Sequence, residues 1–539
     1  MRMHGTFLLV LAGAIVLAGC GSSTDADQAP IDESTANDSA AESDTADADG
    51  AAAAPVSAEL LTIGSQVDLA TFDPAESVQG GQFIHYLQAT YDTLLQRDSE
   101  GDIRPHLAIE WEYREDNTVL ALTLRDDATF EDGSPVDAEA VAAALEHLGQ
   151  GTGGDGSRAV SNITDIEVVG DHELALTLGE PDPGLLYWMT TYGGFIVNPA
   201  ALSDVDALAS QPAGSGPYLL DDDATVRGSE YHFTKRTDHW DADSYPYERV
   251  VIRPIEDAAA RLNALLAGQI DAMFGSSDMV GQAEAAGIDI DTVTDQRVGL
   301  YFNRLDGSMV EEMGDVRLRQ AINLAIDRQS LVDNLYDGFA QPTTQIFNPG
   351  TVAWQDELTE VYAYDPDRAR ELVEELGYSV DDPIVLPIGT ITPGLEDLTS
   401  VTVSALAAVG IEADIVPVPL DGSYVENLLA EQTYFLSFGT AGQAWIDIDK
   451  YLDPGAVWYP SGYESAEMTD LIAQIRIAED AQAEALLQEL NTLVVEEALF
   501  APFVLTENIY LSSPEVVATL QQGGQPVPSL FYYAPADPS

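Results

Sequence analysis

The sequence predicts a mixed α/β protein with at least two domains. Short segments in which apolar and polar residues alternate predict strands, and longer alanine- and leucine-rich segments with helical spacing lie between them. About 480 residues follow the N-terminal region, which is more than one hydrophobic core usually serves. Because the two kinds of segment are interleaved along the chain, the α/β class is favoured over separate helical and all-β domains.

The first twenty residues have the pattern of an export signal. Arg2 and His4 precede an apolar run over residues 7–17, which is followed by Ala18, Gly19 and Cys20. The run is too short for a transmembrane helix, which needs ~20 apolar residues. Leu-Ala-Gly-Cys resembles the bacterial lipobox, which implies a signal peptide over residues 1–19 and lipidation of Cys20. An incidental cysteine beside an ordinary cleavage site is the alternative.

Cys20 is the only cysteine of the 539 residues. The chain therefore forms no intramolecular disulfide and has no cysteine-based metal site. Acyl chains on Cys20 would hold the protein at a membrane surface, since each buried methylene contributes about 0.8 kcal/mol. The following residues are small, polar and acidic, with no lysine or arginine. Together they predict a lipidated N-terminus and a disordered acidic tether over residues 20–58.

The charge balance restricts the partners of the protein. The chain has 92 acidic and 21 basic residues, a formal net charge of -71. Such a surface repels nucleic acid and anionic lipid, so no nucleic-acid partner is expected and membrane contact is expected through the lipid alone. The charge is spread along the whole chain, which favours adaptation to high salt. A preference for cationic ligands is the alternative.

Individual elements can be predicted in order from the mature chain. Alternating or continuous apolar runs predict strands at 60–63, 119–124 and 173–178. Helical spacing predicts a helix over 137–148 and another over 257–267, the second between an acidic cap and Gly268. A long amphipathic helix is predicted over 316–335. Arg319 and Arg328 lie on it nine residues apart, so separate ion pairs are expected for them rather than one anion site.

Enzyme motifs are incomplete in this sequence. His172-Glu173 lacks the second histidine of a zinc-binding helix, and its segment alternates like a strand. The glycine-rich residues 151–156 follow a predicted helix, whereas a dinucleotide-binding loop follows a strand. The Gly-x-Ser-x-Gly elbow of serine hydrolases is absent from the sequence. The sequence thus predicts no catalytic residues, no metal site and no cofactor.

A series of short motifs occurs in one fixed order along the mature chain. They are Leu-Thr-Ile-Gly at 61–64, Thr-Phe-Asp-Pro-Ala at 71–75, Phe-Glu-Asp-Gly-Ser-Pro-Val at 130–136, Gly-Ser-Gly-Pro-Tyr at 214–218, Asp-Val-Arg-Leu-Arg-Gln-Ala-Ile-Asn-Leu-Ala-Ile-Asp-Arg at 315–328 and Tyr-Asp-Pro-Asp-Arg-Ala-Arg at 364–370. This series resembles the peptide/nickel family (family 5) of ABC-type extracellular solute-binding proteins along essentially the whole mature chain.

The resemblance implies a two-lobed, type II periplasmic-binding-protein-like fold with an extra subdomain inserted in lobe one. The motif positions place lobe one at 59–95, 212–298 and 502–539, the inserted subdomain at 96–211 and lobe two at 299–501. The chain would cross between the lobes near 297–300 and 500–503. Closure would be a rigid rotation about these two crossings.

The resemblance also implies the function. The protein is expected to be an exported, monomeric binding lipoprotein on the outer face of the cytoplasmic membrane or in the periplasm. It would capture a small, peptide-like solute by lobe closure and deliver it to an ABC permease, with no chemical step. Two alternatives remain open: a binding lipoprotein that serves as a sensor or chaperone without a transporter, and an enzyme that reuses the fold.

Residues 438–449 resemble the tryptophan- and glycine-rich run of the family that leads to Asp-Pro-Asp. In peptide binders of the family, an aspartate just before that triplet grips the free amine of the ligand. Gln443 or Ala444 stands at the matching place here, so a free dipeptide is disfavoured. Trp445 and Asp447 are expected to contact the ligand together with Gln443, since an aromatic ring beside a carboxylate suits flat or cationic groups.

The turn after the first predicted strand commonly faces the cleft in this family. The resemblance therefore adds Gln66, Asp68 and Gln79 to the expected ligand contacts. The alternative for the other segment is that Trp445 is an ordinary core residue and Asp447 belongs to a solvated turn.

Overall fold

The computed structural model describes residues 58–77, 84–152, 155–391, 395–418, 433–440, 442–454, 456, 458–478, 480–523 and 525–536, apart from the side chains of 295, 391, 437–440 and 480. The predicted signal peptide, Cys20, nearly all of the predicted tether and Gln79 lie outside these residues. Within the described residues, no helix is both long enough and apolar enough to cross a membrane.

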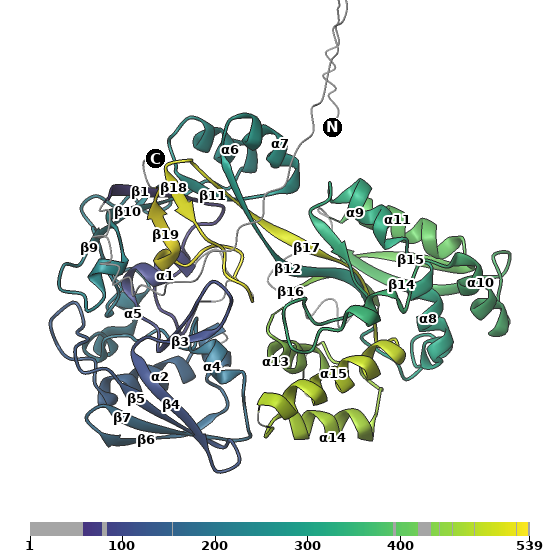
Figure 1. Cartoon of the computed structure of the whole chain (residues 1–539), viewed down its shortest axis with the longest axis horizontal. Helices are drawn as coiled ribbons and strands as arrows, with labels where there is room; N and C mark the ends of the chain where they lie inside the picture. The colour runs from purple at the N-terminus through teal and green to yellow at the C-terminus, as the bar shows by residue number, and fades with distance from the viewer. Residues whose placement is uncertain are drawn as a thin grey trace, which may run out of the picture. The chain divides into compact units, whose positions relative to one another are not determined.

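An eleven-stranded mixed sheet runs through the molecule in the order β15-β14-β16-β12-β17-β11-β1-β10-β9-β8, with β13 also paired to β17 (Figure 1). Its strands are β1 Ala58–Ser65, β8 Tyr218–Leu220, β9 Tyr231–Lys235, β10 Tyr247–Pro254, β11 Ala272–Gly275, β12 Asp289–Tyr301, β13 Ala340–Pro342, β14 Ile384–Ile391, β15 Ile411–Val418, β16 Tyr434–Thr440 and β17 Phe500–Ser512. The predicted strand at 60–63 is part of β1.

Two long strands, β12 and β17, connect the two ends of this sheet. They pair antiparallel along their whole length, and the first half of β17 also borders β13 while its second half borders β11. Their register shifts between Val298 and Gly299. A Cβ on Gly299 would lie 2.5 Å from the carbonyl oxygen of Ala501, so the close approach of the strands requires glycine. This irregular stretch coincides with the predicted crossings between the lobes.

A second, four-stranded antiparallel sheet has the order β4-β5-β7-β6. Its strands are β4 Ala108–Arg114, β5 Val119–Leu124, β6 Ile163–Gly170 and β7 Glu173–Leu178, and the helix α2 (Ala138–Gly149) lies against it. The alternating leucines of β5 and β7 face α2 and are buried, because successive side chains of a strand point to opposite faces. The predictions for 119–124 and 173–178 are confirmed.

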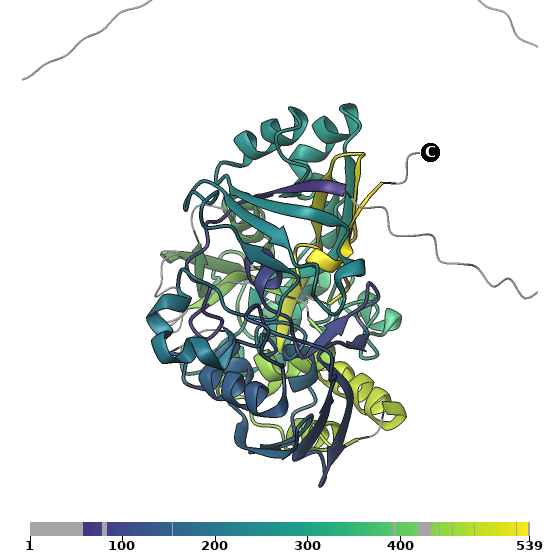
Figure 2. The ribbon, with the colours of Figure 1, turned by 90° about the vertical axis from the view of Figure 1, so that its left-hand side faces the viewer.

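The remaining elements complete the two ends of the molecule. Helices α6 and α7 lie at the end opposite the four-stranded sheet (Figures 1 and 2). The short strands are β2 Leu95–Arg97, β3 Ile103–Pro105, β18 Val516–Ala518 and β19 Tyr533–Pro535. The helices are α1 Ile84–Thr90, α3 Asp155–Ala159, α4 Leu185–Trp188, α5 Val205–Leu208, α6 Ala258–Leu266, α7 Ser277–Ala285, α8 Val316–Leu324, α9 Arg328–Leu335, α10 Pro366–Glu375, α11 Glu396–Ala407, α13 Ala444–Asp447, α14 Ala466–Ile475 and α15 Asp480–Glu496.

Side-chain caps explain where the predicted helices begin. Asp137 accepts a hydrogen bond from the backbone N–H of Ala140 at the start of α2, and Asp257 caps α6 in the same way. Both helix predictions are confirmed. The prediction of one helix over 316–335 is wrong, because the chain breaks between α8 and α9. Asp327 accepts from the N–H of Ser330 and starts a new helix there.

The two arginines predicted to form separate ion pairs differ in their surroundings. Arg319 lies 3.7 Å from the Glu497 carboxylate and donates to nearby carbonyls, as expected. The prediction is wrong for Arg328, which is buried and donates to the carbonyls of Thr343, Pro502, Asn323 and Tyr362. Within the described residues no carboxylate lies at ion-pair distance from it. Arg328 therefore joins α8, β17 and two loops through backbone contacts.

The buried apolar side chains form three large clusters. One surrounds β12, β14, β16 and the first half of β17, a second surrounds β1, β10 and α1, and the third lies between α2 and the four-stranded sheet. The division into lobe one, inserted subdomain and lobe two stays a prediction, as do its residue boundaries.

Candidate functional site

The segment predicted to contact a ligand follows the sheet strand β16. Gln443 immediately precedes α13, and α13 continues directly into a π-helical turn, Ile448–Leu452. Because β16 pairs with β12 on one side and β14 on the other, α13 is held close to the long connecting strands. Gln443, Trp445 and Asp447 thus lie together on one short segment.

Asp447 is fully buried and forms an ion pair with Arg297 of β12, at 3.2 Å between Oδ1 and Nη2. The Arg297 guanidinium also donates to the Tyr301 hydroxyl and the Ile346 carbonyl, and it lies over the Tyr451 ring. Burial raises the pKa of the Asp447 carboxyl, and Arg297 opposes that shift. The alternative of a solvated turn is therefore wrong for Asp447.

The second carboxylate oxygen of Asp447 is buried and makes no hydrogen bond to any described residue. A ligand contact for Asp447 stays a prediction. What the geometry establishes is that Asp447 joins α13 to the connecting strand β12, because its charge is balanced by Arg297.

Trp445 is 8% exposed and packs against the loop that follows β7. A Cβ at Gly184 of this loop would collide with the indole ring, so a glycine is needed for the ring to lie there. The Arg476 guanidinium lies 5.2 Å from the centre of the ring. The indole Nε1 is buried and faces the Asp182 carboxylate of the same loop, where it opposes the rise that burial causes in the pKa of that group. Trp445 is thus a contact between two parts of the chain that are distant in sequence, and its ligand role also stays a prediction.

Gln443 makes a similar contact, since its Nε2 donates to the Gly101 carbonyl at 3.1 Å. Gln66 and Asp68 lie in the loop after β1, and each forms a hydrogen bond with a residue far from α13. Gln66 accepts a long hydrogen bond from Arg261, and Asp68 accepts from the Tyr231 hydroxyl at 2.8 Å. Within the described residues, the hydrogen bonds of Gln66 and Asp68 do not reach α13, so the structure shows two separate groups of predicted residues.

Arg297 and Arg476 are the residues at this site that the sequence analysis missed. Neither residue lies in the segment 438–449 that was predicted to contact the ligand. The one hint in the sequence is that basic residues are scarce, since the chain has 92 acidic but only 21 basic residues. In such an acidic chain, any arginine that the fold brings near the predicted segment is a strong candidate for a specific contact. The sequence could not tell which arginine this would be.

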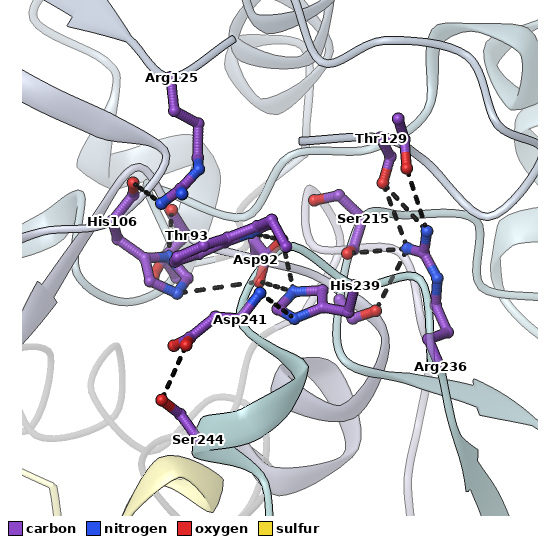
Figure 3. Close-up of polar contacts among 12 residues, drawn as sticks. Asp92, Thr93, His106, Arg125, Thr129, Ser215, Arg236, His239, Asp241 and Ser244 are labelled. Carbon is purple, nitrogen blue, oxygen red and sulfur yellow. Dashed lines mark hydrogen bonds and ion pairs between the residues drawn. The ribbon is translucent and has the colours of Figure 1, made fainter. Parts of the chain in front are cut away.

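A second buried polar cluster surrounds Asp92, just after α1 (Figure 3). His239 Nε2 donates to the Asp92 carboxylate at 3.1 Å, because the N–H of Asp241 donates to its other ring nitrogen. His106 donates from Nδ1 to the Thr93 carbonyl, and its Nε2 faces Asp92 at 3.8 Å. Burial alone would raise the pKa of Asp92, but the two histidines and Trp240 hold it below its ordinary value.

A cavity of about 40 Å³ borders this cluster and is lined by Asp92, His106 and Gln525 among others. It is large enough for about three or four water molecules, at roughly 10–15 Å³ each. Within the described residues, no group of three or more histidine, cysteine, aspartate or glutamate side chains could hold a metal ion. Nearby, Arg236 donates to the carbonyls of Thr129 and Ser215 and ties three loops together (Figure 3). We read this cluster as structural.

The mixed sheet with two shared strands is the architecture of a two-lobed periplasmic binding protein. The chain belongs to the bacterial extracellular solute-binding proteins, family 5, whose model matches residues 102–462. This confirms the predicted family and fold class. The members of this family capture solutes outside the cytoplasm for ABC importers, so the predicted transport role is supported as well.

Individual relatives agree with this assignment. The chain is 25% identical over 492 residues to the probable D,D-dipeptide-binding periplasmic protein DdpA of Escherichia coli K12, covering 86% of this chain and 91% of the relative. It is 23% identical over 436 residues to the glutathione-binding protein GsiB of Salmonella paratyphi A, covering 77% of this chain and 83% of the relative. The structure of DppA from Helicobacter pylori in complex with the peptide STSA has a TM-score of 0.72 at 22% identity and covers 89% of this chain and 98% of that one.

Proposed function

We propose that this chain binds a peptide-like solute between its two lobes and passes it to the permease of an ABC importer. Two relatives are named for a D,D-dipeptide and for glutathione, and a structural neighbour was solved with a short peptide. These names support the peptide class. The observation that carries the proposal is the position of Trp445, where the α13 segment meets the loop after β7.

The chemistry beside Trp445 narrows the ligand. The family's amine-binding aspartate is replaced by Gln443 or Ala444, and the Gln443 side chain already donates to the Gly101 carbonyl. A free terminal amine would therefore find no matching carboxylate at that place. Capped or longer peptides and related amines fit better, because an aromatic face with nearby carboxylates binds cationic or flat groups without an N-terminal ion pair.

The proposal includes the location. The protein would be exported and held by lipid on Cys20 at the outer face of the cytoplasmic membrane or in the periplasm, with the acidic segment as a spacer. The lipobox resemblance and the names of periplasmic relatives support this. It would act as a monomer, without cofactor and without catalysis.

The test is a ligand screen on a soluble Cys20→Ser protein, measured by thermal unfolding and small-angle scattering. A ligand at a concentration of 100 Kd stabilises the bound protein by about 2.7 kcal/mol. N-capped dipeptides or tri- to pentapeptides should raise Tm and reduce the radius of gyration. Stabilisation by non-peptide solutes alone would overturn the ligand class, and stabilisation without compaction would overturn the closure mechanism.

A further inference from the structure

Arg476 joins two parts of the chain that are far apart in sequence. It follows α14, and its Nη1 donates to the Pro181 carbonyl at 3.0 Å in the loop after β7. The same guanidinium lies 3.2 Å from the Glu180 carboxylate of that loop. In return, Asn117 from the turn between β4 and β5 donates to the Arg476 carbonyl at 3.1 Å.

Arg476 is also tied to its own side of the interface. Its Nη2 donates to the Asp453 carboxylate at 2.5 Å, and its guanidinium covers the Trp445 ring. The side chain is only 13% exposed. A partly buried guanidinium that bridges carboxylates on two elements is worth more than an exposed surface pair, because water and salt screen it less.

We propose that Arg476 is a positioning residue that latches the α13–α14 side of the cleft to the loop after β7 and so holds Trp445 in place. The inference rests on the proposed function in one respect, that this contact forms when the lobes close. It adds to that function a residue that stabilises the closed form before any ligand contributes.

The contact that Arg476 forms brings more carboxylates than cationic side chains close together. Glu180 and Asp182 come from the loop after β7, and Asp449 and Asp453 come from the turn after α13, next to Lys450. Burial, and then the approach of Asp182, raise the pKa of Asp449 to about 7, while Arg476 opposes the shift. Burial likewise raises the pKa of Asp182.

Opening would separate Asp449 from the two carboxylates of the other side and would hydrate it. Its pKa would then move toward the ordinary value of about 3.9. The closed form therefore holds a proton that the open form releases between about pH 4 and pH 7. Because the closed form binds more protons, acid favours closure, and closure weakens as the pH rises through about 7.

The test measures the distance across the interface in ligand-free protein. In the Cys20→Ser background, which has no other cysteine, spin labels are placed at Val169→Cys on β6 and Gln482→Cys on α15, both exposed. We expect two populations, one with a short and one with a long distance, and the ratio of short to long should fall about thirtyfold from pH 5.5 to pH 8.5.

Variants separate the latch from general stability. Arg476→Gln should shift the distribution to long distances at both pH values, and Arg476→Lys should restore part of the short population. Asp449→Asn should keep the short population at pH 8.5 and flatten the pH profile. The control Arg368→Gln removes an exposed arginine that pairs with Glu371 on α10, and it should change nothing.

An unchanged distribution in Arg476→Gln would overturn the proposal, as would a pH profile that Asp449→Asn does not alter. If Arg476→Gln lowers the Tm so far that it unfolds, Arg476→Lys and Asp449→Asn still decide. The outcome is independent of the ligand class, because failure of every peptide to stabilise the protein would leave these ligand-free distances as they are.

Discussion

Replacing Asp447 with alanine should destabilise the protein strongly, because it leaves Arg297 buried without its counter-ion. Both side chains are fully buried, and the pair joins α13 to β12. Removing one partner of a buried ion pair costs about 3–5 kcal/mol. The lower end is expected here, since Arg297 keeps its hydrogen bonds to the Tyr301 hydroxyl and the Ile346 carbonyl.

The assay is calorimetric unfolding of the ligand-free protein. A loss of about 3 kcal/mol corresponds to a Tm decrease of roughly 6–12 °C for a domain of 150–250 residues. Asp381→Ala removes an exposed aspartate of the same part of the chain and should cost less than about 0.5 kcal/mol. Replacing both partners, Arg297→Met with Asp447→Leu, should recover much of the loss, because no charge is then left unpaired.

A loss below about 1 kcal/mol in Asp447→Ala would refute this reasoning. It would mean that Asp447 is not needed to balance Arg297 and is free to serve the ligand. A strong loss carries a practical consequence, since ligand-binding defects in Asp447 variants would then report instability as well as lost contacts.

Three further predictions concern the anchor, the ligand and the buried histidine. Cys20→Ser should move the protein from the membrane fraction to the soluble fraction, and retention in the membrane would contradict lipidation. Trp445→Ala should abolish ligand-induced stabilisation, whereas the control Trp354→Ala, which removes a partly exposed tryptophan, should keep it. Burial lowers the pKa of His85 to about 4, so the folded state favours the neutral imidazole. Up to about 3 kcal/mol of folding stability should therefore be lost as the pH falls from 6.5 to 4. His85→Gln should flatten this loss, and an unchanged pH profile would show that another group causes it.

The sequence by itself determined the class of protein and its local elements. Alternation placed β5 and β7 at their observed bounds, and an acidic cap placed the start of α6. These features depend on residues within one or two turns of each other, so the local pattern contains them. The ordered motifs were sufficient for the family, because the family model matches most of the same range.

Tertiary structure decided the roles of individual side chains. Asp447 looked like a candidate for a ligand contact, but it pairs with Arg297, 150 positions earlier in the chain. Arg476 meets the Pro181 carbonyl across 295 positions. Arg328, at the start of α9, donates to the carbonyls of Thr343 and Tyr362 in two loops and to that of Pro502 in β17, 174 positions later in the chain. Such pairings depend on the path of the whole chain, since a buried charge must find its partner wherever the fold brings one within reach.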